Sequence, residues 1–421
     1  MSKTQNSNKS THIHFRSLKV QDDEGASRYF LPALQVIAHS IAPLRKALIH
    51  FYFLSKSKTL ERIEWRTLQA FGQVCQALIA PSSNDEESST DAPPVDPTQF
   101  YKELVVCLKT FESNLQPKDA TEALQILMTT IQRCCRALPI TSQLWSALLD
   151  AAGLGLILKQ SIVGRCILEE DGQILQRTKK ESIMMWCPWV LPKPRNTPAS
   201  KISIDRAIQE CCAKQSFDYD FDQSPYDFEV RIPLLTRTIS DEKDTSNWVT
   251  TIALNFSSLT TYLFLAIPRL DEDSGALKTP EEWKIPKRLD VSKLCVKELF
   301  KEKVGNTKYE LIGGILHDGE EDYVAVVRNP SVEDPEDDDA WKLMESEEII
   351  GMAESDVFDF LQGEGEGDPC GTVVVYRRCG EEPHQEMNQL LSDIVLSQIS
   401  GKLEYSGTNA EFYYEEEMID D

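Results

Sequence analysis

Hydrophobic residues recur at helical spacing through the first third of the chain. Apolar positions three and four residues apart run from Phe30 to Phe53, from Phe100 to Phe111 and from Asp119 to Leu138. This spacing places them on one face of a helix. Pro43 is expected to bend or break the first of these helices near its end. Residues 140–160 are rich in Leu, Ala and Gly and predict a helix followed by a turn.

After residue 160 the pattern changes to short runs rich in β-branched and aromatic residues. Gly, Pro and acidic clusters separate these runs, as in an antiparallel sheet. The predicted strands are 161–168, 182–190, 248–255, 260–267, 309–316, 323–328 and 371–378. A helical first half followed by a strand-rich second half is typical of an α+β fold.

Other segments are too polar to belong to the core. Residues 1–16 predict a disordered N-terminus, and residues 82–97 and 330–340 predict mobile insertions. Their composition buries too little apolar surface to offset the entropy lost on ordering. The last part of the chain, 381–421, combines an amphipathic helix at 384–400 with an acidic tail.

Composition excludes several classes of function. The net charge is −24, with 68 acidic against 44 basic residues, which argues against nucleic-acid binding because phosphates need a basic surface. It is compatible with a basic protein partner. No run of 18 or more apolar residues indicates a membrane span, and the N-terminus lacks the apolar core of a signal peptide. We expect no membrane association.

Eleven cysteines show no regular spacing, although two vicinal pairs occur at Cys134–Cys135 and Cys211–Cys212. Irregular spacing favours free thiols in a reducing compartment, cytoplasmic or nuclear, over a disulfide framework. Gly313-Gly314 and the glycines of 363–367 lack the Lys-Ser/Thr of a phosphate-binding loop, so we predict turns there.

Residues 25–48, GASRYFLPALQVIAHSIAPLRKAL, resemble the nucleophile box of the ubiquitin-specific proteases. These ubiquitin carboxyl-terminal hydrolases (peptidase family C19) carry Gly-x-Thr-Cys-Tyr-x-Asn-x-x-x-Gln before a long helix that ends near Pro-Leu-Arg. Further boxes of that family are resembled in the same order. They are 118–128, 263–270, 283–291, 309–319, 322–329, 341–349 and 373–378.

The resemblance implies a papain-like ubiquitin-specific-protease fold over residues 17–380. Its helical thumb would span 17–160. A sheet-rich palm, with the zinc-finger extension reduced or lost, would span 161–380. Zinc knuckles of that extension need two Cys-x-x-Cys pairs, and this chain has none. Cys166 and Cys187 stand near the first knuckle's position without partners, so we expect no metal and no other cofactor.

The chain departs from the family at every catalytic position. The family's cysteine falls at Arg28, its general-base histidine at Asp322 and its orienting aspartate at Glu345. The asparagine of the oxyanion hole falls at Asp23, where a carboxylate would repel the developing oxyanion. A guanidinium is not a nucleophile and stays protonated in proteins. We therefore expect no catalytic residues.

If Arg28, Asp322 and Glu345 converge as the family's triad does, they could form an ion-pair cluster that joins the helical and sheet halves. Alternatively, Arg28 points into solvent and blocks the path of a ubiquitin tail. His317 matches a non-catalytic His-x-Gly of the family and is expected to be a structural residue at a strand end. His39 is expected to be a half-buried packing residue.

The favoured hypothesis is a catalytically inactive module that binds ubiquitin, a ubiquitin-like protein or a protein complex of the ubiquitin pathway. One alternative is an active cysteine deubiquitinase with a displaced nucleophile, for which the candidates are Cys75, Cys107 and Cys166. The other is a member of the family's inactive branch that serves in pre-mRNA splicing.

Overall fold

The computed structural model describes most of the chain between Phe15 and Gly380. The described residues are 15–19, 27–56, 59–79, 94–110, 117–137, 157–167, 174–184, 187–191, 202–212, 215–218, 248–256, 259–269, 283–295, 306–318, 322–345, 348–363 and 369–380. The predicted helix at 384–400, the acidic tail and most of the 82–97 segment lie outside these residues.

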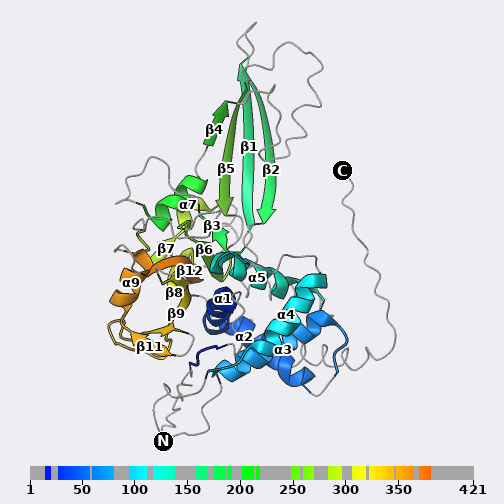
Figure 1. Cartoon of the computed structure of the whole chain (residues 1–421). Coiled ribbons are helices and arrows are strands. Elements are labelled where there is room, and N and C mark those ends of the chain that lie inside the picture. Colours follow the sequence, from blue (N-terminus) through cyan, green and yellow to red (C-terminus); the bar gives the residue numbers. More distant parts are fainter. Residues whose placement is uncertain are drawn as a thin grey trace, which may run out of the picture.

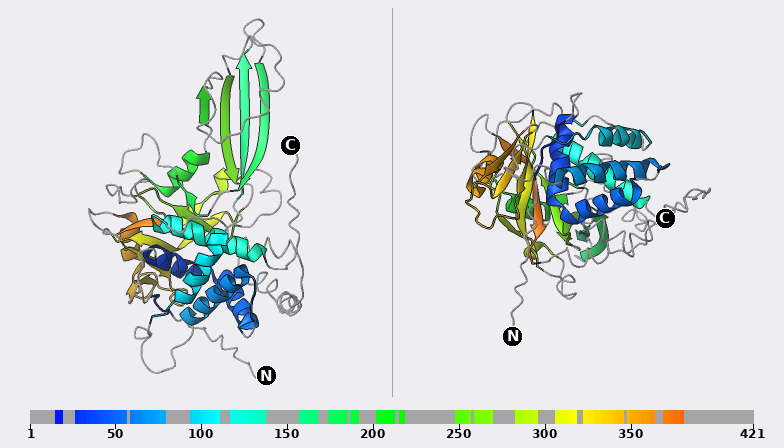
Figure 2. Two further views of the ribbon diagram at one scale, coloured as in Figure 1. Left: turned by 45° about the vertical axis from the view of Figure 1, so that its right-hand side comes forward. Right: turned by 90° about the horizontal axis from the view of Figure 1, so that it is seen from below.

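A group of helices packs against one face of a large sheet, and a second, smaller sheet projects away from both (Figure 1). Viewed from below, the helices, the large sheet and α9 form successive layers (Figure 2). Helices thus dominate the N-terminal half and mostly antiparallel strands the C-terminal half, which confirms the predicted α+β class and the fold expected of a ubiquitin-specific protease.

Five helices make up the thumb. They are α1 (Ser27–Ser40), α2 (Ala42–Ser55), α3 (Ile63–Ile79), α4 (Thr98–Thr110) and α5 (Ala120–Arg136). Helix α2 begins directly after the break that follows α1, and Pro43 lies in its first turn. The missing N–H of a proline breaks no helical hydrogen bond at this position. Asp119 caps α5 by accepting a hydrogen bond from the Glu122 N–H at 2.8 Å.

The large sheet has eight strands, seven of them in the order β11-β10-β9-β8-β12-β6-β3, with β7 also paired to β8. Their bounds are β3 (Trp189–Val190), β6 (Tyr262–Ala266), β7 (Arg288–Asp290), β8 (Lys308–His317), β9 (Tyr323–Arg328), β10 (Trp341–Met344), β11 (Ile349–Met352) and β12 (Cys370–Arg378). One face packs on the thumb helices, and the other is covered by α7 (Ile204–Cys212), α9 (Glu354–Gln362) and the buried Trp283. Because both faces are buried, the central strands are almost continuously apolar.

The projecting sheet lies almost entirely in the region 161–380, where the resemblance implies a palm and a finger extension that is reduced or lost. It is antiparallel in the order β2-β1-β5-β4. Its strands are β1 (Ile157–Ile167), β2 (Ile174–Met184), β4 (Gln215–Asp218) and β5 (Trp248–Phe256).

Some local predictions were wrong. Gly313 and Gly314 lie inside β8 rather than in a turn. A β-carbon at Gly313 would be 2.8 Å from the Ser40 side-chain oxygen, and one at Gly314 would be 2.7 Å from the Val373 carbonyl oxygen. These glycines therefore allow close packing of neighbouring elements. Gly363, with φ +70°, does end a helix as a turn residue.

Strand boundaries also differ from the prediction at the base of the fingers. Residues 157–160 belong to β1 rather than to a helix and turn, and β2 covers 174–184 rather than 182–190. Long-range pairing explains the second difference, because the polar run Gln176–Glu181 pairs along its whole length with β1.

The acidic stretch 330–340 is exposed, as predicted, but its backbone is held by specific hydrogen bonds. The Asn329 side-chain amide donates to the Asp339 carbonyl oxygen at 3.1 Å. The Glu354 N–H donates to the Pro335 carbonyl oxygen at 2.8 Å, which ties the stretch to the start of α9. It is a loop with its own backbone hydrogen bonds rather than the mobile insertion that its composition predicted.

Phe15, which was assigned to the disordered N-terminus, is only 6% exposed and packs in the core of the thumb. Among the helices that the structure describes, none has the length and apolar character needed to cross a membrane.

Candidate functional site at the amino end of helix α1

The first turn of α1 meets the start of β9. The Tyr29 and Tyr323 rings are in edge-to-face contact with centroids 5.6 Å apart. Arg28 directly precedes Tyr29 in the helix, and Asp322 directly precedes Tyr323 in the sheet. The fold therefore brings these two backbone positions to the same place, although they are far apart in sequence.

Glu345 reaches the same end of the sheet from β10. Met344 is paired with Ala325 of β9, so Glu345 continues the register next to Val324, close to the start of β9. The Glu345 N–H donates to the Glu348 carbonyl oxygen at 3.0 Å and closes the turn into β11. Asp322 and Glu345 are both exposed, which leaves two carboxylates in solvent at this end of the sheet.

A short turn fixes Asp322 at the start of β9. The Asp318 N–H donates to the Asp322 carbonyl oxygen, and the Asp322 N–H donates to the Asp318 carboxylate, both at 3.0 Å. His317 ends β8 with 4% exposure and meets the Tyr323 ring edge to face at 4.9 Å. Burial lowers the pKa of His317, against the opposing effect of the Asp318 and Asp322 carboxylates. It is the structural strand-end histidine that was predicted.

The side chain of Arg28 and all of Asp23 lie outside the described part of the chain. The ion-pair cluster of Arg28, Asp322 and Glu345 therefore stays a hypothesis.

The opposite end of α1 is held by Arg45, a residue that the sequence offered only as part of a family motif. Its guanidinium is buried and donates from Nη1 to the carbonyl oxygens of Ala38 and His39 at 2.8 and 3.3 Å. These are among the last carbonyls of α1, where the helix dipole favours a cation. Arg45 thus fixes α1 against α2 and, through the rigid helix, the position of its first turn.

His39 packs as predicted and does not titrate near neutral pH. Its ring stacks on Phe15 with centroids 5.1 Å apart. Burial, followed by the nearby charge of Arg45, lowers the pKa of His39 to about 3.

Replacing Arg45 by methionine should destabilise the protein by about 1.5–3 kcal/mol, because two buried carbonyl groups lose a charged donor. Denaturant unfolding followed by circular dichroism measures the change. Lys46→Met, at an exposed position on the same helix, is the control and should change stability by no more than about 0.5 kcal/mol. Equal effects of the two changes would contradict the capping role.

The cysteines in the thumb core are buried and out of reach of a substrate. Cys75 is fully buried, which raises the pKa of its thiol to about 12. Cys107 is also fully buried and lies 3.7 Å, sulfur to sulfur, from Cys134. The Cys166 side chain lies outside the described part. Within the described ranges no three His, Cys, Asp or Glu side chains come together as a metal site would require.

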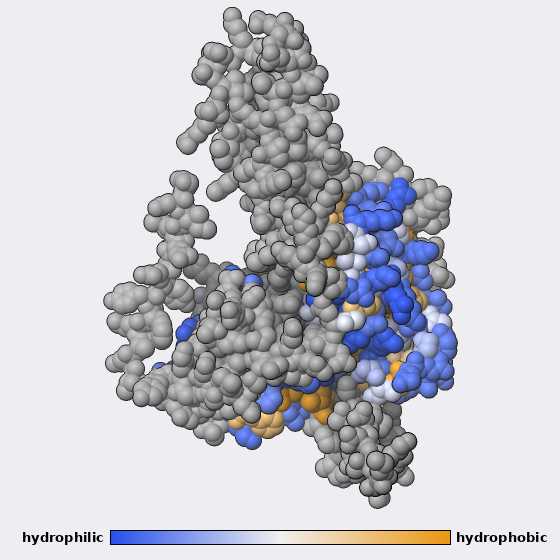
Figure 3. Space-filling view, turned by 180° about the vertical axis from the view of Figure 1, so that it is seen from behind, coloured by the Kyte–Doolittle hydropathy of each residue, from blue (hydrophilic) through white to orange (hydrophobic). Residues whose placement is uncertain are grey.

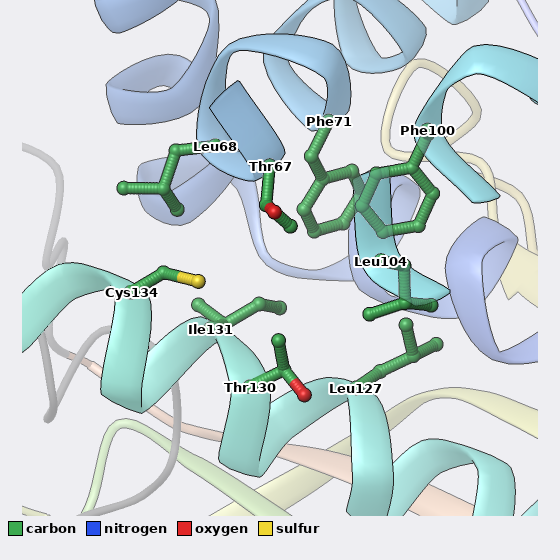
Figure 4. Close-up of a pocket in the computed structure, with 9 residues that line it drawn as sticks. All are labelled: Thr67, Leu68, Phe71, Phe100, Leu104, Leu127, Thr130, Ile131 and Cys134. Atoms are coloured by element: carbon green, nitrogen blue, oxygen red, sulfur yellow. The ribbon is translucent and has the colours of Figure 1, made fainter. Parts of the chain in front are cut away.

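A cavity of about 10 Å³ lies between α3, α4 and α5 (Figure 4). It is lined by Thr67, Leu68, Phe71, Phe100, Leu104, Leu127, Thr130, Ile131 and Cys134. A space of this size barely accommodates a single water molecule. It is a packing defect of the thumb core and not a ligand site.

Comparison with protein families matches residues 24–359 of the chain to the model of the ubiquitin carboxyl-terminal hydrolases. The match includes α1, both strands of the candidate site and most of the large sheet. None of the curated proteins compared with the chain matches it.

Proposed function

The chain belongs to the ubiquitin carboxyl-terminal hydrolase family, and on that premise we propose that it is a catalytically inactive member. It would bind ubiquitin, a ubiquitin-like protein or another protein of the ubiquitin pathway, in the cytoplasm or nucleus. One observation carries the proposal. The fold joins the amino end of α1 to the start of β9, and those positions hold Arg28 and Asp322 instead of a cysteine and a histidine.

The missing chemistry cannot be supplied by position alone. A cysteine protease needs a thiolate, which the amino end of a helix stabilises. It also needs a base that accepts the thiol proton and returns it to the leaving group. Arg28 has no proton to give up near neutral pH. This pair therefore lacks both the thiolate and the histidine base of the cysteine-protease mechanism.

A displaced nucleophile is the alternative, and burial argues against two of its three candidates. No substrate carbonyl can reach Cys75 or Cys107, which are both 0% exposed. Cys166 belongs to β1 of the projecting sheet, in the finger extension rather than in the thumb or palm. The splicing-associated branch of the family differs in its partner and not in its chemistry, so it remains a second candidate.

Binding needs only surface, and the architecture that would offer it is retained. The described residues form a group of helices, a large sheet and a smaller projecting sheet (Figure 1), which we take as thumb, palm and fingers. The strongly negative chain suits a basic partner surface, and the resemblance implies that ubiquitin's recognised face is basic. A member of the family without catalytic activity could therefore still bind a partner through these elements.

The experiment is a calorimetric titration of the full chain with ubiquitin and with a panel of ubiquitin-like proteins. Asp322→Arg should weaken binding about tenfold, equivalent to ~1.4 kcal/mol, because it reverses a charge at the candidate site. Asp356→Arg, which reverses an exposed carboxylate on α9, is the matched control and should leave the affinity within about twofold. Equal effects, or no binding of any of these proteins, would reject the proposal.

A double-mutant cycle on Arg28→Met and Asp322→Asn tests the hypothesis that these two residues form an ion pair. Because Asp322 is exposed, solvent screens the pair, and we expect a coupling free energy of only about 0.2–1 kcal/mol in chemical unfolding. This is smaller than a buried pair would give. Additive effects would remove the ion pair and favour an Arg28 that points into solvent.

A further inference from the structure

Among the strands that the structure describes, β11 forms one edge of the large sheet, and its outer side has no paired strand. This strand is last in the strand order and is paired with β10. The Glu345 N–H donates to the Glu348 carbonyl oxygen, so these two residues form a hydrogen-bonded pair of the antiparallel hairpin. From this pair along β11, the backbone N–H and C=O groups of successive residues point alternately toward β10 and away from it. Ile349 and Gly351 therefore turn their N–H and C=O groups toward the open edge.

An apolar side chain accompanies this edge. Ile350 is 38% exposed, one of the few large hydrophobic residues in the described chain that face solvent to this extent. It is paired with Leu343, which belongs to the core on the α9 face of the sheet. A further strand beside β11 would place a side chain next to Ile350 and extend that core.

Carboxylates border both ends of β11. Glu345 and Glu348 precede it and are exposed. At the other end, Gly351 lies against the acidic loop 330–340. A β-carbon at Gly351 would be 2.5 Å from the Asp338 carbonyl oxygen. Among the described residues of 330–363, eleven are acidic and one is basic, and that one, Lys342, is already paired with Asp339.

The coloured residues on the face seen from behind are mostly hydrophilic, with small hydrophobic areas among them (Figure 3). The charge decides what the edge can accept. A second copy of the chain would bring the same carboxylates against each other, and a nucleic acid would be repelled. A cationic segment gains both electrostatic attraction and backbone hydrogen bonds.

We propose that the outer edge of β11 binds an extended peptide rich in Lys or Arg, which pairs with it as an added strand. An apolar residue of the peptide packs on Ile350. Its basic residues lie beside Glu345, Glu348 and the acidic loop. This surface adjoins the α1–β9 junction at Glu345, but the outer backbone edge of β11 and Ile350 lie outside that junction. The proposal does not depend on the proposed function.

The test measures fluorescence anisotropy of a labelled, end-capped peptide of roughly eight alternating Lys and Val residues with the full chain. Binding should weaken at least about tenfold between low and high salt, because surface charges are screened. N-methylation of alternate peptide bonds on the pairing edge should abolish it. An otherwise identical peptide with Glu in place of Lys should not bind.

Protein variants locate the site. Ile350→Ser and Glu348→Lys should each weaken peptide binding about tenfold. Ile350→Ser, on the α9 face of the sheet, should also leave the ubiquitin titration unchanged. Val190→Ser, on the opposite edge strand β3 and 57% exposed, is the matched control and should bind as the wild type does. The proposal is overturned by absence of Lys–Val peptide binding, by insensitivity to N-methylation, or by equal effects of Ile350→Ser and Val190→Ser. In these cases the carboxylates serve only to keep the edge from pairing.

Discussion

Purified protein is expected to release fluorophore from carboxyl-terminally labelled ubiquitin no faster than buffer does. Arg28 supplies no thiolate, and Asp322 cannot take the role of the histidine. A positioned general base alone contributes about 10²–10⁴-fold to such reactions, and the nucleophile is absent as well. Cleavage that a single Cys→Ser change abolishes would overturn this prediction and identify the displaced nucleophile.

A positive counterpart makes the result informative. The combined changes Asp23→Asn, Arg28→Cys, Asp322→His and Glu345→Asp restore the residues that the family carries at the matching positions of the sequence. We expect this variant to be labelled covalently by ubiquitin vinyl sulfone, and the wild type not to be labelled. The same set with Arg28→Ser is the control, because it lacks only the sulfur. Failure of the restored variant to react while it still binds ubiquitin would mean that the backbone at α1 and β9 no longer has a catalytic geometry.

Replacing Gly72 by alanine should destabilise the fold by at least about 3 kcal/mol, at the upper end of what overpacking typically costs. Gly72 lies in α3 and faces α2. A β-carbon there would be 2.1 Å from the Leu48 carbonyl oxygen and 2.9 Å from the Tyr52 β-carbon. The first of these is a backbone atom, so relief requires α2 to move as a whole.

The direction of the stability change distinguishes packing against α2 from intrinsic helix propensity. In an isolated helix, Gly→Ala is stabilising by about 1 kcal/mol. Urea unfolding of Gly72→Ala and of Gln73→Ala, which changes an exposed neighbour on the same helix, separates packing from propensity. Gln73→Ala should stay within about 0.5 kcal/mol of the wild type. A stabilised Gly72→Ala variant would show that α2 and α3 are not in contact as described.

Much of the architecture was readable from the sequence because burial on one face leaves a local record. The apolar spacing of 30–53 anticipated α1 and α2, and Pro43 marked the break between them. The apolar runs at 309–316 and 323–328 became β8 and β9 at the centre of the sheet. The order of degenerate boxes anticipated the family that residues 24–359 match.

Features that depend on contacts between residues distant in sequence could not be predicted from the local pattern. Gly313 and Gly314 looked like a turn because the need for glycine comes from Ser40 and Val373, which only the folded chain brings near. The polar residues of β2 become a strand because β1 pairs with them. The acidic loop at 330–340 looked unstructured because the hydrogen bond that ties Pro335 to α9 is invisible locally.

The candidate site divides in the same way. The sequence by itself determined which residues stand at the matching positions, Arg28 and Asp322 in place of a cysteine and a histidine. Only the tertiary structure decided that these positions meet at the contact of Tyr29 with Tyr323, that Arg45 holds the far end of α1, and that β11 is left as an open edge. Residue identity is a local property, whereas proximity and exposure follow from the packing of elements far apart in the chain.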